Sequence, residues 1–252
     1  MSEAQRVRAV RWGLIAVALI AIEIVPRLGI VNPIALVPLS EMVWQLWLLI
    51  SDGTLITHIV RTLTSIVVAG VLAVVTGLPL GVALWRLETT RRVLQPYLTT
   101  YYAIPIFAFY PLFIAIFGLG AWPVIIIAWA WSVVAIVLNT VIGLAEVPPV
   151  LVKVGRSLRL SPWRMFTRIY FPAATPYVFT GFKLAASYTV IGVIASEFIQ
   201  AESGVGWFVG FSYNNFAIQN MYAAILLILA FAILINSLLL RLERRIYGRQ
   251  AA

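Results

Sequence analysis

Stretches of about twenty apolar residues recur along this chain, and each of them contains at most one or two charged side chains. A helix of that length crosses the roughly 30 Å hydrocarbon layer of a bilayer. Inside lipid the backbone must satisfy its own hydrogen bonds, which favours helices. Hydrophobic residues make up 62% of the chain and charged residues only 11%, whereas roughly a quarter of the residues in soluble domains are charged. The sequence therefore predicts an all-α integral membrane protein.

Six membrane-spanning helices can be delimited, at about 12–31, 63–85, 97–117, 122–144, 174–199 and 221–240. The segment after the first span predicts a short helix at the membrane surface, with Ser40 as its N-cap and its end near Asp52 and Gly53. No small-residue cleavage site follows the first span, so we expect it to be retained and not to be a signal peptide. We expect residues 1–252 to form a single transmembrane domain.

Basic residues are concentrated in four segments, which hold 15 of the 18 Lys and Arg residues. These segments are the N-terminal tail, the 86–92 link, the 148–172 region and the C-terminal end, and in a six-span arrangement all four face the same side. The positive-inside rule assigns that side to the cytoplasm. We therefore expect both termini to be cytoplasmic. This placement explains the net charge of +9 without nucleic acid, whose binding needs a soluble basic face.

The scarcity of reactive side chains argues against an enzyme. The chain has no cysteine, and His58 and Asp52 are its only histidine and aspartate. A metal cluster, or a nucleophile with its base and orienting carboxylate, needs more groups than these. The two lysines, Lys153 and Lys183, do not follow glycine, so the Gly-Lys pair of a phosphate-binding loop is absent. We expect no catalytic residue, no metal and no cofactor in this chain.

Three ionisable residues lie within or near the ends of apolar stretches, where such groups are functional candidates by default. Glu23 stands four residues before Arg27, a spacing that favours an ion pair within one helix. Lys183 either extends to the cytoplasmic side or lines a polar path. We expect Glu197 to anchor the outer end of its span.

Glycine and proline mark two of the spans. Gly70, Gly77 and Gly81 share one helical face, which predicts the close approach of a neighbouring helix. Pro105 and Pro111 interrupt the third span and free backbone carbonyls that a neighbour or a wet cavity must satisfy. The third span is therefore a candidate path-lining or hinge helix.

A basic polar loop, at about 145–172, separates two apolar spans. Its Lys153, Arg156 and Arg159 are spaced three apart, which predicts that they lie along one side of a short helix. Ser161 followed by Pro162 predicts the start of a second helix. A solvated anchor would explain the charges as well, but the alternating apolar residues favour an element that docks on another protein.

This loop resembles the cytoplasmic loop of binding-protein-dependent ABC importer permeases. The family pattern runs Glu-Ala-Ala, three residues, Gly, nine residues, Ile, one residue, Leu-Pro. Residues 153–155 stand at the Glu-Ala-Ala positions, Arg159 stands at the Gly, and residues 169–172 stand at the Ile-x-Leu-Pro. Lys153 thus reverses the charge of the family's Glu, and Arg159 replaces its Gly.

The resemblance extends over almost the whole chain and points to the nitrate, sulfonate and taurine branch of these permeases. The matching elements are VPLSEMVWQLW, Asp52-Gly53 with His58, Gly77-Leu78-Pro79-Leu80-Gly81, Pro105 and Pro111 before Phe117-Gly118, Gly181-Phe182-Lys183, and Glu197 followed by Gly204-Val205-Gly206. The resemblance implies the type I ABC importer permease fold in a bacterial inner membrane. It also implies a homodimer, a separate cytoplasmic subunit that binds ATP and magnesium, and a soluble substrate-binding protein outside.

By this resemblance the loop is a coupling element for the ATP-binding subunit, and its expected contact residues are Lys153, Gly155, Arg156, Arg159, Ser161, Pro162, Trp163, Arg164 and Pro172. The expected substrate path comprises Tyr102, Phe107, Trp131, Asn139, Lys183 and Tyr188. Lys183 would suit an anion such as nitrate or a sulfonate, whereas the aromatic residues would suit a small heteroaromatic vitamin precursor. The alternative function is an ion-coupled secondary carrier, which needs a relay of ionisable groups and often internal repeats.

Overall fold

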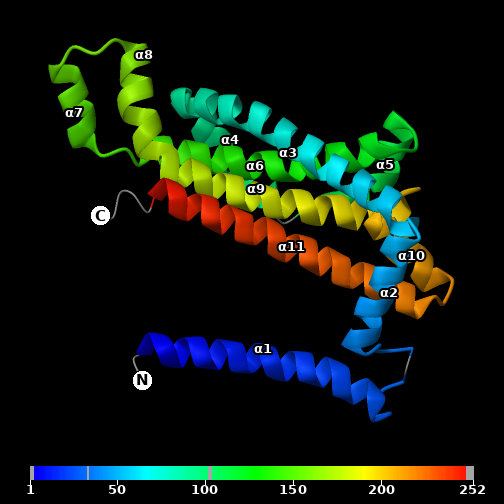
Figure 1. Ribbon diagram of the computed structural model, residues 1–252. Coiled ribbons are helices and arrows are strands. Elements are labelled where there is room, and N and C mark those ends of the chain that lie inside the picture. Colours follow the sequence, from blue (N-terminus) through cyan, green and yellow to red (C-terminus); the bar gives the residue numbers. More distant parts are fainter. Residues whose placement is uncertain (1–2, 33, 102–103, 248–252) are drawn as a thin grey trace.

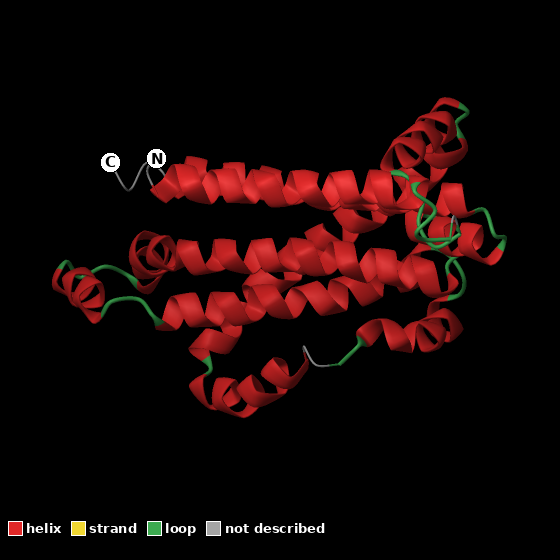
Figure 2. Cartoon of the chain, turned by 90° about the horizontal axis from the view of Figure 1, so that it is seen from below, coloured by secondary structure: helices red, strands yellow, loops and turns green. Residues whose placement is uncertain are grey.

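Long helices running side by side form the body of the protein (Figures 1 and 2). The computed structural model describes residues 3–32, 34–101 and 104–247, and no strand occurs in these ranges. Within them, five helices are long and apolar enough to cross a membrane, and a sixth span results if one bent pair is counted. The long helices are α1 (Glu3–Arg27), α3 (Thr54–Arg86), α6 (Ala121–Ala145), α9 (Phe171–Gln200) and α11 (Ile218–Tyr247). The predicted all-α membrane architecture is confirmed.

Short helices gather at the two ends of this body (Figure 1). One end carries α2 (Leu39–Ser51), α5 (Tyr110–Phe117) and α10 (Val205–Asn214). The other end carries α7 (Pro149–Ser157) and α8 (Pro162–Met165), together with the start of α1 and the end of α11. The basic segments therefore lie at one end of the molecule, which we term the basic end.

Helices α3, α6 and α9 pack closely because glycines face their neighbours. A Cβ atom on Gly77 would lie 2.9 Å from the Ile136 Cβ, and one on Gly81 would lie 2.7 Å from the Thr140 Cβ. Gly70 has open space around it. The predicted close approach along the glycine face is therefore confirmed at Gly77 and Gly81 only.

A buried polar network joins α3, α9 and α10 at the end opposite the basic end. Glu197 is 1% exposed, and its carboxyl oxygens accept from the Thr62 hydroxyl at 2.8 and 3.0 Å. Gly206 N–H donates to Glu197 Oε2 at 3.1 Å, and Val205 N–H donates to Thr62 Oγ1 at 2.8 Å. Two otherwise unpaired N–H groups of the first turn of α10 are thereby satisfied. Glu197 anchors this end of α9, as expected.

Glycines make room for this network. A side chain at Gly204, whose φ is +116°, would overlap the Glu197 carboxyl group. A Cβ on Gly206 would lie 2.5 Å from the Ile194 carbonyl oxygen. Gly204 N–H donates to His58 Nδ1 at 3.1 Å. The pattern of Glu197 followed by Gly-Val-Gly thus encodes one compact joint between α9 and α10.

Helix α1 stands apart from the other long helices (Figure 1), and its side chains are exposed along most of its length. The predicted ion pair between Glu23 and Arg27 is confirmed, with Arg27 Nε donating to Glu23 Oε1 at 2.8 Å. Glu23 also accepts from the backbone N–H of Ser40 at 2.9 Å. The prediction that Ser40 is the N-cap of α2 is wrong: Pro38 holds that position, and Glu23 supplies the missing acceptor from another helix.

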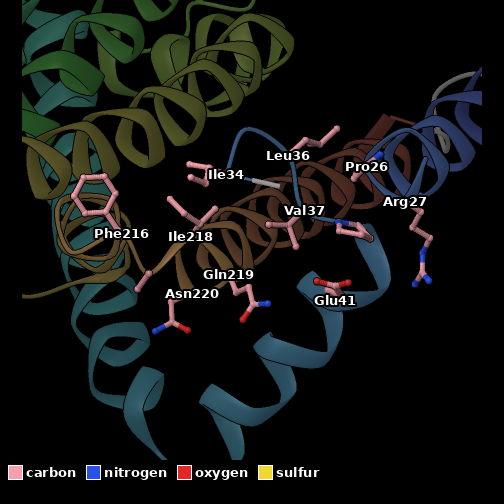
Figure 3. Close-up of a pocket in the computed structure, with 12 residues that line it drawn as sticks. Pro26, Arg27, Ile34, Leu36, Val37, Glu41, Phe216, Ile218, Gln219 and Asn220 are labelled. Atoms are coloured by element: carbon pink, nitrogen blue, oxygen red, sulfur yellow. The ribbon is translucent and has the colours of Figure 1, made fainter. Parts of the chain in front are cut away.

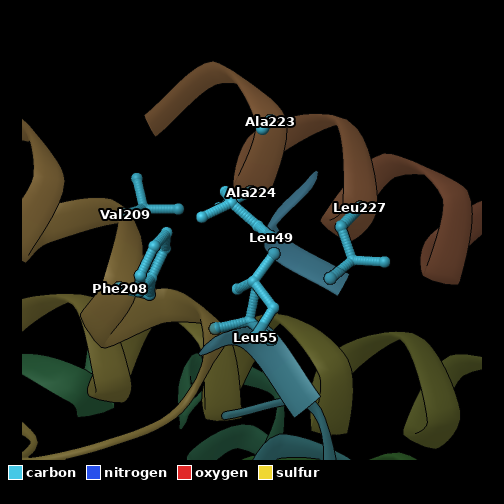
Figure 4. Close-up of a cluster of buried hydrophobic side chains, with 8 residues drawn as sticks. Leu49, Leu55, Phe208, Val209, Ala223, Ala224 and Leu227 are labelled. Carbon is cyan, nitrogen blue, oxygen red and sulfur yellow. The ribbon is translucent and has the colours of Figure 1, made fainter. Parts of the chain in front are cut away.

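Helix α2 ends at Ser51, close to the predicted Asp52 and Gly53, and the chain turns there through Gly53 at φ +83°. Behind this turn, side chains from α2, α3, α10 and α11 form a buried hydrophobic cluster (Figure 4). The labelled members are Leu49, Leu55, Phe208, Val209, Ala223, Ala224 and Leu227.

The third predicted span, 97–117, is not one helix. The chain forms α4 (Glu88–Tyr101), a 3-10 turn at Ile106–Phe109 and then α5, and the two parts are bent by 84°. Pro105 precedes the turn with φ −73° and ψ 80°, outside the helical region. Pro111 lies in the first turn of α5, where its missing N–H costs no hydrogen bond. The two prolines therefore produce one break and one helix start in place of two kinks.

Candidate coupling loop and substrate path

The first arm of the basic loop is α7, which ends in a left-handed residue. Leu160 N–H donates to the Gly155 carbonyl at 3.1 Å, and Arg159 N–H donates to the Arg156 carbonyl at 2.9 Å. These two bonds define a Schellman motif. Arg159 occupies its left-handed position with φ 48°, which explains why the family pattern has glycine there.

The second arm begins as predicted and then continues into the membrane. Ser161 is the N-cap of α8, with its hydroxyl accepting from Arg164 N–H at 3.4 Å, and Pro162 opens the helix. A π-helical turn at Phe166–Tyr170 joins α8 directly to α9, and Pro172 lies in the first turn of α9. The second arm is therefore an extension of a span at the basic end and not a separate short helix.

Gly155 locks the two arms together. A Cβ on Gly155 would lie 2.5 Å from Ile169 Cδ1 and 2.6 Å from Met165 Sδ. The absence of a side chain lets α7 lie directly on the second arm. The loop is thus a packed hairpin. A packed hairpin can transfer movement to the adjoining membrane helix better than an unstructured segment can.

Two cationic side chains of α7 line a cavity, whereas several apolar side chains of the hairpin are exposed. Lys153 and Arg156 line a cavity between α7 and the start of α4. Val154, Leu158 and Trp163 are 50%, 67% and 70% exposed. The prediction that Arg159 shares a helix side with Lys153 and Arg156 is wrong, because α7 ends at Ser157 and the chain reverses at Arg159.

Three residues of the expected substrate path come together. The rings of Phe107 and Trp131 lie 5.9 Å apart, and those of Trp131 and Tyr188 lie 5.6 Å apart and stack at 12°. We term Phe107, Trp131 and Tyr188 the aromatic cluster. The indole N–H of Trp131 is buried and has no hydrogen-bond acceptor among the described residues. A solute with an acceptor group could satisfy that N–H.

The other path residues lie elsewhere. Lys183 Nζ binds Glu243 Oε1 at 2.7 Å, which ties α9 to the basic end of α11. Asn139 donates to the carbonyl of Ala135 in its own helix at 2.9 Å. Tyr102 lies outside the described residues. Glu243 could not be found from the sequence, because it stands 60 positions from Lys183 within a charged tail that predicts only solvation.

A cavity of ≈ 500 Å³ opens at the end opposite the basic end, between the α1–α2 connection and the start of α11 (Figure 3). Arg27, Glu41 and Asn220 line it, together with Phe216. Phe216 has φ 56° and is 82% exposed. A bulky aromatic residue in left-handed backbone is unusual.

Comparison with known proteins identifies relatives over most of the chain. The sequence pattern of the family described as "Binding-protein-dependent transport system inner membrane component" matches residues 73–248. The taurine transport system permease protein TauC of Escherichia coli (strain K12) is 27% identical over 239 residues, covering 93% of this chain and 87% of the relative.

Other relatives carry different substrate names. The nitrate import permease protein NrtB of Synechocystis sp. is 28% identical over 193 residues, covering 77% of this chain and 70% of the relative. The formylaminopyrimidine transport permease protein ThiX of Halalkalibacterium halodurans is 25% identical over 194 residues, covering 77% and 78%.

A solved structure shares the fold. It is described as an inward-facing conformation of the MetNI methionine ABC transporter, and it aligns with a TM-score of 0.65 at 20% identity. The alignment covers 76% of this chain and 95% of that chain. The type I permease fold expected from the sequence is confirmed. Because the family match spans most of the residues and the fold agrees, this chain belongs to the binding-protein-dependent inner-membrane permeases of ABC importers.

Proposed function

We propose that this chain is the transmembrane subunit through which an ATP-driven importer moves a small solute into the cytoplasm. Two copies form the path, a separate cytoplasmic subunit binds ATP and magnesium, and a soluble binding protein delivers the solute at the opposite face. In this arrangement both termini and the basic end are cytoplasmic, in keeping with the positive-inside rule. The cavity beside Phe216 then faces outward and suits the delivering protein.

The observation that carries this proposal is the hairpin at 149–172. Gly155 fixes its two arms, and its second arm is continuous with the membrane helix α9. Exposed apolar side chains on its surface would be hidden in a groove of the ATP-binding subunit, and burying Leu158 or Trp163 would contribute about 1.5–3 kcal/mol each. Movement of that subunit would then be passed directly to α9.

Leu158→Asp tests this docking surface. We expect the variant to insert normally but to lose the ATP-binding subunit on purification, because a carboxylate would be buried in an apolar contact. Leu87→Asp is the matched control, since Leu87 is also exposed near the basic end but lies outside the hairpin. Retention of the subunit by both variants would contradict the docking role. Uptake that persists in vesicles without ATP would favour the ion-coupled carrier.

For the solute itself, the side-chain geometry favours a small planar heteroaromatic compound. Lys183 is neutralised by Glu243, so it offers little to a passing anion. The aromatic cluster supplies ring faces and the unpaired Trp131 N–H, which suit a ring bearing a hydrogen-bond acceptor. Among the substrates in the relatives' names, formylaminopyrimidine fits this description better than nitrate or taurine.

Uptake of labelled formylaminopyrimidine, nitrate and taurine into vesicles shows which of these compounds is the substrate. We expect ATP-dependent uptake of the pyrimidine, lowered about tenfold or more by Trp131→Phe, because the donated hydrogen bond contributes about 0.5–1.5 kcal/mol and an orphaned solute acceptor costs more. Trp129→Phe is the control, since its indole N–H is already bonded to Thr76. Preferential uptake of nitrate or taurine would overturn the assignment of a planar solute.

A further inference from the structure

A second cavity, of ≈ 710 Å³, lies at the basic end between the start of α4 and α7. Four cationic side chains line it, from three separate helices: Arg86, Arg91, Lys153 and Arg156. The exposed apolar residues Leu158 and Trp163 are not among its lining residues. The cavity therefore excludes the two apolar residues proposed to dock on the ATP-binding subunit, although Lys153 and Arg156 are also among the contacts that the family resemblance implies for that subunit.

The positive charge in this cavity is not balanced by the protein. Glu88 is the one acidic residue in its lining, and its carboxylate is bound at 2.6 Å by Arg92, which is not part of the lining. None of the four lining cations makes an ion pair with a described residue. Arg86 instead lies over the Phe166 ring, at 5.9 Å. Like charges that converge in a cavity repel one another unless an anion joins them.

The surroundings of these cations identify the kind of anion. Leu144 and Val147 give the cavity an apolar wall, and Trp85 and Tyr170 lie beside it with their rings 4.8 Å apart. Aromatic residues of this type mark the level of lipid headgroups. Arginine binds phosphate oxygens in bidentate fashion. Basic pockets between membrane helices on the cytoplasmic side bind the headgroups of anionic lipids.

We propose that this cavity binds the phosphate headgroup of an anionic phospholipid from the cytoplasmic leaflet. The phosphate lies among Arg91, Lys153 and Arg156, and the glycerol and acyl chains lie against the apolar wall. A bound headgroup bridges α4 to α7 and so restrains the first arm of the coupling hairpin. The leaflet named here follows from the proposed orientation, but binding itself does not depend on the chain's transport function.

Native mass spectrometry of the full-length chain, titrated with phosphatidylglycerol or phosphatidylcholine, tests this site. Each Lys or Arg near a lipid surface contributes roughly a factor of five to binding. We therefore expect Arg91→Gln with Arg156→Gln to weaken phosphatidylglycerol binding roughly 30-fold. The control, Arg164→Gln with Arg168→Gln, removes two charges outside the cavity lining and should change binding less than about twofold.

Three results would overturn the proposal: equal weakening by the control pair, unchanged binding by the cavity pair, or equal affinity of the wild-type chain for phosphatidylcholine. Inorganic phosphate is titrated separately. If it binds with the same dependence on Arg91 and Arg156 while phosphatidylglycerol does not bind, the ligand is a soluble phosphate and the lipid assignment is wrong. If the double variant elutes as an aggregate, the Arg91→Gln variant alone tests the proposal, and its affinity for phosphatidylglycerol should fall about fivefold.

Discussion

Replacing Glu197 by alanine should destabilise the protein more than any exposed substitution in the same helix. The carboxyl group holds the Thr62 hydroxyl and the Gly206 N–H, and it lies where α3, α9 and α10 meet. Alanine removes both acceptor oxygens and leaves a hollow that Gly204 and Gly206 are too small to fill. The first turn of α10 would lose the group that completes its hydrogen bonding.

The size of the stability loss follows from the polar groups that lose their hydrogen-bond partner. A buried N–H or hydroxyl without a partner costs about 1–3 kcal/mol, and Glu197→Ala leaves one of each. The hollow left by the deleted side chain adds about 1 kcal/mol. A loss of roughly 3–7 kcal/mol is therefore expected, and in a chain of this size it lowers the unfolding midpoint by roughly 6–28 °C.

Thermal unfolding of the purified chain in detergent measures this loss, and Glu197→Gln supplies the decisive comparison. Its side-chain oxygen can still accept from Gly206 N–H, and its amide can donate to Thr62 Oγ1, so we expect a midpoint within a few degrees of wild type and unimpaired uptake. If Glu197→Gln kept the stability but abolished uptake, the carboxyl group would be acting in ion coupling. The structural reasoning would be refuted by a Glu197→Ala midpoint equal to that of the wild type, or by a Glu197→Gln midpoint as low as that of Glu197→Ala.

Three further predictions concern the hairpin and the topology. Gly155→Leu should separate the arms at Met165 and Ile169, cost about 1–3 kcal/mol and reduce co-purification of the ATP-binding subunit; unchanged recovery of that subunit would refute the packing role of Gly155. Arg159→Gly should raise stability by about 1 kcal/mol, because glycine adopts the left-handed conformation without strain, and a lower unfolding midpoint would contradict this. Since the chain has no cysteine, the single-cysteine variants Ser157→Cys and Glu202→Cys report the topology directly. An impermeant maleimide should label Glu202→Cys from outside and Ser157→Cys only in inverted vesicles. The reverse labelling pattern would refute the proposed orientation.

Much of this architecture was predictable because a membrane restricts the chain so strongly. The apolar stretches predicted the long helices, and Ser161 with Pro162 predicted the start of α8, since local chemistry alone decides these features. The bend between α4 and α5 was harder to predict from the sequence. Pro105 and Pro111 look equivalent in sequence, and only the path of the chain shows that one of them opens a helix.

Contacts between distant segments were the least predictable part of the candidate sites. Glu23 pairs with Arg27 at helical spacing, which the sequence indicates, but it also binds Ser40 in another helix. The pairing of Lys183 with Glu243 likewise depends on how α9 and α11 are placed in space. Periodicity can assign a residue to a helix face, but it does not identify the helix that the face will meet.

The two departures of the loop from its family pattern have different physical consequences. Arg159 only strains a turn whose hydrogen bonds remain intact. Lys153 changes the charge of the cavity beside α4, because the family's Glu at this position would neutralise Arg91 or Arg156, whereas lysine adds a further cation to them. Lys153→Glu should therefore weaken phosphatidylglycerol binding roughly 30-fold while preserving the hairpin. A variant that bound the lipid as tightly as wild type would show that these cations do not form the site.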